Sequence, residues 1–254
     1  MATYKKRGYK PKTKKDKVEV VEENSTTAEV FNTLDEGASK TEEWVVKNQK
    51  YIIGLIGVVA VVVLAFLGYN KYIAEPQQKD AMNEMYTAKK YFDDAASGMS
   101  SDSLYRMALD GGEGKYGMVD IAREYSGSPA ANLANYYAGI SYLNLKDYEN
   151  AIEYLSDFSS DDKMLGPIAK GGIGDAFVQL EQLAEGLEYY QKAFEANVND
   201  FTTPMYLMKA ARVAIDLGQN DKALEYLNRI KSDFSTSTEA SQTDVLIGQV
   251  EASL

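Results

Sequence analysis

Glycine stands beside lysine at two places in this sequence, and in other proteins such pairs cradle the phosphates of a nucleotide. The segment 170–174, KGGIG, fails as a dinucleotide loop because it lies inside a helical pattern and Phe177 replaces the third glycine. Gly114-Lys115 fails as a phosphate-binding loop because Leu109 replaces the upstream glycine and Tyr116 follows the lysine. The sequence therefore predicts no nucleotide site.

Closely spaced acidic residues are the second arrangement that could do chemistry. The segment 157–162, DFSSDD, lacks the glycine and the ligand spacing of a calcium loop. The pairs Asp93-Asp94 and Asp161-Asp162 lie in polar runs, without the apolar surroundings that raise a carboxyl pKa for acid catalysis. The chain has no histidine and no cysteine, which excludes histidine bases, thiol nucleophiles, disulfides and most zinc sites. We predict a non-enzymatic protein without cofactor or metal.

Small and large residues alternate in three segments after Pro129 that superimpose at offsets of 35 and 37 residues. Small residues recur at the eighth and twentieth positions, namely Gly139, Gly174, Ala211 and Ala151, Gly186, Ala223. Larger residues follow at the eleventh, twenty-fourth and twenty-seventh positions, namely Tyr142, Phe177, Ala214, then Leu155, Tyr190, Leu227, then Phe158, Ala193, Ile230, with alanine as the exception at two of them. Two antiparallel helices cross closely only where side chains are small, so the pattern resembles the tetratricopeptide repeat, in which each repeat is a pair of helices A and B.

The resemblance implies a concave face lined by the second, fifth, ninth and twelfth residues of each helix A. We select as candidate partner-binding residues Leu133, Tyr136, Ile140, Leu143, Ile168, Val178, Met205, Met208 and Arg212. This face is mostly apolar with adaptable methionines, which suits apolar segments or a partner helix, and the Lys/Asn clamp for a C-terminal carboxylate is missing. The alternative is that a terminal helix or a second copy of the chain covers this face.

A membrane anchor is predicted between Lys50 and Lys71, where twenty uncharged residues can form a helix of about 30 Å. About fifty residues precede this segment and no clear cleavage site follows it, so we predict an uncleaved anchor over residues 51–70 rather than a signal peptide. Gly54, Gly57 and Gly68 lie near one helical face and are candidates for contact with another membrane protein. The alternative is that glycine is simply common in membrane helices.

Charge predicts the orientation of the anchor. The basic residues within twenty positions of its two ends are nearly equal in number, three before it and four after it, whereas residues 1–17 contain eight lysines and arginines against the single acid Asp16. This tail favours a cytoplasmic N-terminus and a periplasmic C-terminal domain, and it could also touch anionic lipid or ribosomal RNA. From residue 71 onward 29 acidic residues face 16 basic ones, which argues against nucleic acid as a ligand of the main domain.

The predicted fold is therefore all-α, with one N-terminal transmembrane helix followed by a tetratricopeptide-like α-solenoid. Residues 1–50 form a basic tail that is disordered to about residue 30 and then forms an interfacial helix, with a helix start at Thr41. Residues 71–128 form a juxtamembrane helical segment, which could be a degenerate first helix pair. Residues 129–254 contain the repeats and a capping helix from Ser237.

The order of these parts resembles the YfgM-type bacterial inner-membrane proteins, most clearly in Trp44-x-x-Lys47-Asn48 before the anchor and in the segment 147–155, DYENAIEYL. The resemblance implies an ancillary subunit of the SecYEG translocon that works beside a periplasmic prolyl isomerase chaperone and handles exported polypeptides. Residues 1–27 look longer and more basic than the tail of that family. The alternative function is a structural adaptor in an envelope secretion or motility complex.

Overall fold

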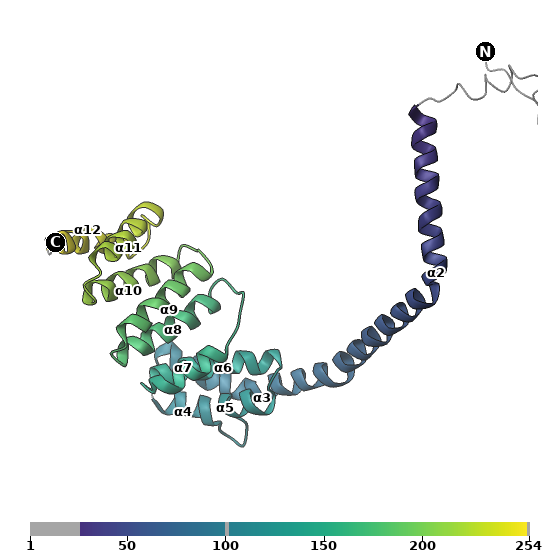
Figure 1. Ribbon diagram of the computed structural model, residues 1–254. Helices are drawn as coiled ribbons and strands as arrows, with labels where there is room; N and C mark the ends of the chain where they lie inside the picture. Colours follow the sequence, from purple (N-terminus) through teal and green to yellow (C-terminus); the bar gives the residue numbers. More distant parts are fainter. Residues whose placement is uncertain (1–25, 100–101, 253–254) are drawn as a thin grey trace, which may run out of the picture. The chain divides into compact units, whose positions relative to one another are not determined.

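A computed structural model describes residues 26–99 and 102–252, with side chains from residue 43 onward except Met99. The described residues contain helices and turns and no strand. The chain divides into two units at Tyr69 and Asn70, the first with one long helix and the second with the stacked helices of Figure 1. The predicted fold class, a helical repeat array after one long apolar helix, is confirmed.

The first unit contains helix α2, Thr26–Tyr69, and the predicted anchor forms its C-terminal part. The apolar window of this helix is long enough to cross a membrane, and none of it is buried by other parts of the chain. The helix begins at Thr26, because residues 26–50 contain no proline and one glycine. The predicted helix start at Thr41 is therefore wrong, and residues 26–30, which were predicted to be disordered, are helical. The rest of the predicted disordered segment lies outside the described residues. The basic tail of residues 1–17 lies outside the described residues.

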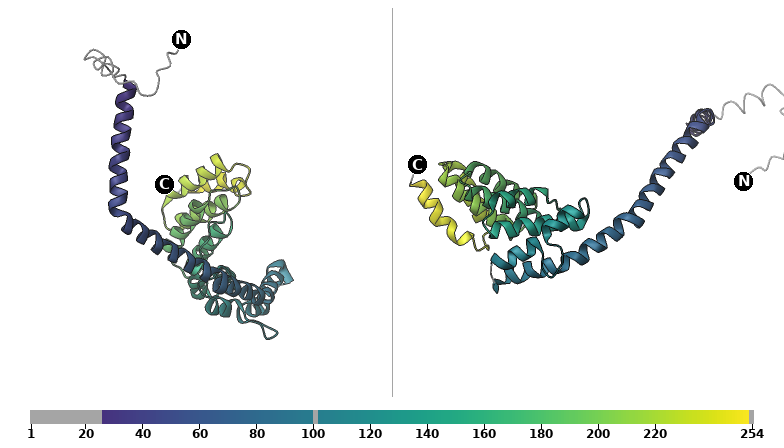
Figure 2. Two further views of the ribbon diagram at one scale, coloured as in Figure 1. Left: turned by 90° about the vertical axis from the view of Figure 1, so that its right-hand side faces the viewer. Right: turned by 90° about the horizontal axis from the view of Figure 1, so that it is seen from below.

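The second unit is a stack of ten α-helices in chain order, with a π-helical turn before and after the first of them, Asn70–Ala74 and Ala95–Met99. The helices are α3 (Glu75–Asp94), α4 (Asp102–Asp110), α5 (Met118–Glu124), α6 (Pro129–Asn144), α7 (Tyr148–Asp157), α8 (Leu165–Gln179), α9 (Leu183–Ala196), α10 (Thr202–Asp216), α11 (Asn220–Asp233) and α12 (Ala240–Glu251). From α5 onward each helix packs against the next, and Figure 2 shows the stack from two further sides. Helices α6, α8 and α10 are helices A, and α7, α9 and α11 are their helices B.

Side-chain hydrogen bonds hold the segments that lead into α6 and α8. Ser128 Oγ accepts a hydrogen bond from the Ala131 amide, and Asp162 Oδ1 accepts from the amides of Met164 and Leu165 at 2.8 and 2.9 Å. These two backbone donors lower the pKa of Asp162. The acidic segment 157–162 thus includes the residue that holds the turn before α8, which is a structural role.

The turn between helix A and helix B needs one residue in the left-handed region. Gly218 closes α10 with φ +69°, and its amide donates to the Ile215 carbonyl at 2.9 Å. Gly218 therefore serves as the left-handed glycine that commonly follows the last residue of a helix. The first two repeats place Lys146 (φ +64°) and Glu181 (φ +61°) at the corresponding turns, where a side chain is strained.

Replacing Lys146 with glycine is therefore expected to raise the free energy of unfolding by about 1 kcal/mol, because glycine relieves the left-handed strain. Urea unfolding followed by circular dichroism measures the change. Gly218→Ala is the matched opposite variant and should lower stability by a similar amount. An unchanged or lower stability of Lys146→Gly would contradict the strain argument.

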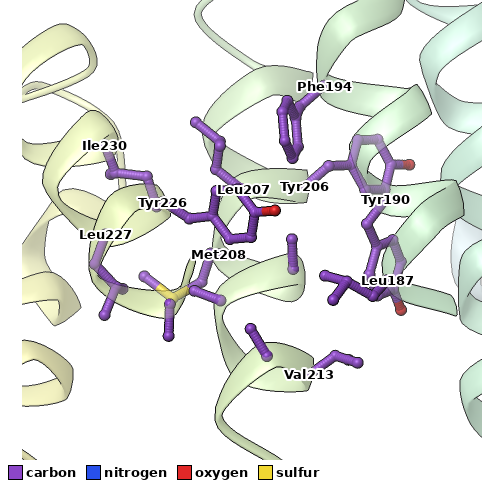
Figure 3. Packing of buried hydrophobic residues seen from close by; sticks show 14 of the residues in the cluster. Leu187, Tyr190, Phe194, Tyr206, Leu207, Met208, Val213, Tyr226, Leu227 and Ile230 are labelled. Carbon is purple, nitrogen blue, oxygen red and sulfur yellow. The ribbon is translucent and has the colours of Figure 1, made fainter. Parts of the chain in front are cut away.

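The core is built where small residues let the helices cross. A side-chain carbon at Gly139 would lie 2.5 Å from Leu155 Cγ of α7, and one at Gly174 would lie 2.7 Å from the Tyr190 ring of α9. Both contacts are too close for a larger residue, which is the reason for the small residues of the repeat pattern. Figure 3 shows the largest cluster, in which side chains of α9, α10 and α11 interdigitate around Leu207 and Tyr226.

The segment before the repeats packs on them as an additional helical layer. The small and apolar face of α3, with Ala81, Met85 and Ala88, lies against α5 and α6 in one buried cluster. The Gln78 side chain accepts a hydrogen bond from the Ala130 amide at 3.0 Å, which fixes α3 at the beginning of α6. Residues 75–124 therefore share a core with the first repeat.

Candidate partner-binding face

The nine candidate residues all lie on helices α6, α8 and α10, as the repeat pattern requires. They pack into three separate hydrophobic clusters, apart from Leu143 and Arg212. Leu133 packs in the cluster of α3, α5 and α6, whereas Tyr136, Ile140 and Ile168 belong to the cluster between α6, α7 and α8. The third cluster is built mainly from side chains of α9, α10 and α11, and the candidates that pack in it are Val178, Met205 and Met208.

Exposure divides the candidates into three kinds. Tyr136 and Met208 are buried, with 8% and 5% of their surface exposed, so they belong to the core beneath the face and offer little surface to a partner. Arg212 is exposed, and its guanidinium donates to Gln242 Oε1 of α12 at 2.7 Å. The remaining candidates are half-buried and present side-chain edges, namely Leu133, Ile140, Leu143, Ile168, Val178 and Met205.

The centre of the predicted groove is filled by the chain itself. Gly171 stands at a groove position of α8, and a side-chain carbon there would overlap the ring of Tyr206 from α10. Tyr206 is 3% exposed and its ring stacks on that of Tyr190, with 6.2 Å between the centroids. An aromatic ring from the next repeat therefore occupies the space that glycine leaves open, and the free part of the face lies to either side of it.

A polar cluster on this face was missed by the sequence reasoning. Asp175 of α8 accepts a hydrogen bond from the Tyr190 hydroxyl at 2.6 Å and pairs with Lys209 Nζ of α10 at 2.7 Å. Lys209 Nζ also lies 5.6 Å from the Tyr206 ring centroid, in range of a cation–π contact. Burial, followed by the Asp175 carboxylate, raises the pKa of Tyr190. Opposite charges 34 residues apart, close to one repeat length, are the signal that could have found this pair.

Alkaline pH is expected to destabilise the repeat domain through its buried tyrosines. Burial and Tyr137 raise the pKa of Tyr136 to about 12, and burial and Tyr154 raise that of Tyr142 to about 12. An unfolded tyrosine has a pKa of about 10, so the native state keeps these protons at higher pH than the unfolded state. The contribution of these tyrosines to the free energy of unfolding should be constant below pH 10 and fall between pH 10 and 12.

Urea unfolding across that pH range measures this dependence, and Tyr136→Phe should make it shallower. Tyr86→Phe is the matched control, because Tyr86 is 74% exposed and should leave the slope unchanged. Equal slopes in the wild type and in Tyr136→Phe would show that Tyr136 does not contribute.

The three glycines of the predicted anchor lie on an open part of α2. A side-chain carbon at Gly54, Gly57 or Gly68 would meet no atom within 4 Å. Their proposed contact with another membrane protein stays a prediction.

Elsewhere, no group of three or more acidic side chains in the described part of the chain is arranged to hold a metal ion.

Comparison with known families identifies the repeats. The tetratricopeptide repeat matches residues 134–157, which include most of α6 and α7, and residues 172–237, which extend from within α8 past the end of α11. The chain therefore contains tetratricopeptide repeats, modules that generally bind other proteins and are not themselves enzymes. No curated protein and no solved structure matches the chain.

Proposed function

We propose that this protein is a non-enzymatic, membrane-tethered scaffold or chaperone at a protein-export site. The observation that carries the proposal is the combination, in one chain, of a fully exposed apolar helix and tetratricopeptide helices with half-buried apolar edges. The exposed helix suits a lipid bilayer, and apolar edges beside charged groups suit a polypeptide with mixed side chains. The specific site, the SecYEG translocon with a periplasmic prolyl isomerase chaperone, rests on the resemblance to YfgM-type proteins.

The proposed topology has the N-terminus in the cytoplasm and the repeats in the periplasm. The acidic repeat domain, with 29 acidic against 16 basic residues from residue 71 onward, suits a position beside an anionic membrane without adhering to it. The basic residues 1–17 favour retention of the N-terminus in the cytoplasm. Exported polypeptides then pass on the side where the repeats lie.

Photo-crosslinking from Met205 tests this proposal in cells that export protein. Met205 is half-buried on the concave face of α10, so a photoreactive residue there should capture translocon subunits, the isomerase or nascent exported chains. Glu153 on helix α7 is the matched control, because it is exposed on the opposite helix layer. Capture of none of these proteins from Met205, or equal capture from both positions, would refute the proposal.

The second candidate function is a structural adaptor that holds one folded partner in an envelope complex. The ion pair between Asp175 and Lys209 and the ring of Tyr206 over Gly171 favour it, because they fix helices α8 and α10 in one arrangement. Co-purification from membranes in mild detergent separates the two functions. One stoichiometric folded partner supports the adaptor, whereas many unfolded clients support the chaperone.

A further inference from the structure

Helix α12 has a small residue at the crossing position of a helix A. The small residues at the crossing positions of α6, α8 and α10 are Gly139, Gly174 and Ala211, and Gly248 follows Ala211 by the same 37 residues that separate Ala211 from Gly174. Glycine weakens the interior of a helix relative to alanine, so a glycine at this position needs a packing reason.

The packing of α12 agrees with this register. In α10, Tyr206 and Val213 are buried, and the Tyr206 ring stacks on Tyr190 of the preceding helix α9. The residues 37 positions later, Thr243 and Val250, are 1% and 2% exposed in α12, which packs on α11. Helix α12 therefore sits on α11 as α10 sits on α9. Its opposite face is the one that a helix B covers in the earlier repeats.

That opposite face is open. A side-chain carbon at Gly139 or Gly174 would collide with a residue of the helix B beside it, whereas one at Gly248 would meet nothing within 4 Å. Val245 is 64% exposed, although Met208 at the corresponding position of α10 is 5% exposed. No helix in the part of the chain that the structure describes occupies this place.

Acidic side chains border the open face. Asp244 and Glu251 flank Gly248, one turn before and nearly one turn after it, and both are exposed. Asp244 pairs with Lys231 of α11 at 2.6 Å while 75% of its side chain remains accessible. Asp244 already has a counter-charge in Lys231, whereas no ion pair is formed by Glu251 within the described residues. A neutral apolar helix would leave Glu251 without a counter-charge, and lysine or arginine beside the crossing would pair with it and add to the pairing of Asp244.

We propose that α12 docks an amphipathic helix of a partner protein in the position that a helix B holds in the other repeats. The bound helix crosses at Gly248 with a small residue, places an apolar side chain on Val245, and carries basic residues toward Asp244 and Glu251. The interface continues the helix A to helix B packing already present three times in the chain. It is separate from the concave face and does not depend on it.

A peptide with the sequence of α11, residues 220–233, is a suitable probe because it carries Ala223, Leu227 four residues later, and three basic residues. Fluorescence anisotropy of the labelled peptide, with the full chain in lipid nanodiscs, measures binding. We expect saturable binding that weakens at least about tenfold in Gly248→Leu, whose side chain blocks the crossing, and in Val245→Glu. The matched control is Val198→Glu, because Val198 is 62% exposed in the loop before α10.

Three results would overturn the proposal: no saturable binding of the peptide, equal binding by wild type and Gly248→Leu, or an equal loss in Val198→Glu. A fourth result that would overturn the proposal comes from sedimentation of the chain in detergent without nanodiscs, which measures its oligomeric state. If the wild type forms a dimer that Gly248→Leu abolishes, the face belongs to a second copy of the chain and not to a partner helix. Crosslinking from Met205 should be the same in Gly248→Leu and wild type, which separates this test from that of the concave face.

Discussion

Two arginines in place of Val59 and Val62 are expected to release the protein from the membrane. Both residues are exposed near the middle of the apolar segment of α2, at 54% and 61%. An arginine at the centre of a membrane helix costs about 3 kcal/mol on the insertion scale, so the pair costs about 6 kcal/mol relative to valine. Membrane flotation of cell extracts measures the fraction that remains bound.

The control for this experiment is the double variant Val59→Leu and Val62→Leu, which should float with the membrane like the wild type. The chain has no cysteine, so a single Ser126→Cys substitution in the anchored protein also reports orientation through a membrane-impermeant thiol reagent. Labelling without permeabilisation of the inner membrane supports a periplasmic repeat domain. Retention of the double arginine variant in the floating fraction would show that α2 is not the anchor.

Replacing Gly171 with alanine is expected to lower the free energy of unfolding of the repeat domain by about 1–3 kcal/mol. The added carbon would overlap the ring of Tyr206, which is buried between α8, α9 and α10 and has little room to move. The ring must leave its place, which also disturbs the stacking on Tyr190 and the Asp175–Lys209 pair. Urea unfolding of wild type and variant gives the difference.

Two further variants isolate the cause of this effect. Adding Tyr206→Leu to Gly171→Ala should recover part of the lost stability relative to the sum of the single changes, because the shorter side chain relieves the overlap. Gly248→Ala is the matched control, since nothing lies within 4 Å of its new carbon and alanine is the better helix former. If the Gly171→Ala variant is as stable as the wild type, Tyr206 does not fill the groove in solution.

The amino-acid sequence by itself determined the parts of this protein that depend on local pattern. Twenty uncharged residues between Lys50 and Lys71 predict a membrane-spanning helix from length alone. The small residues at Gly139, Gly174 and Ala211 predict helix crossings because no larger side chain fits between two close helices, and the structure places buried neighbours at these positions. Gly218 predicts the end of a helix because the turn needs a left-handed residue.

Only the tertiary structure decided what fills the concave face. The position of Tyr206 over Gly171 and the pairing of Asp175 with Lys209 depend on how far α10 is shifted along α8, and that shift is set by the simultaneous packing of α8, α9 and α10. Sequence spacing gives the order of residues on each helix but not this offset between helices. For the same reason the open side of α12 became visible only in three dimensions, because a glycine with and without a neighbour looks the same in the sequence.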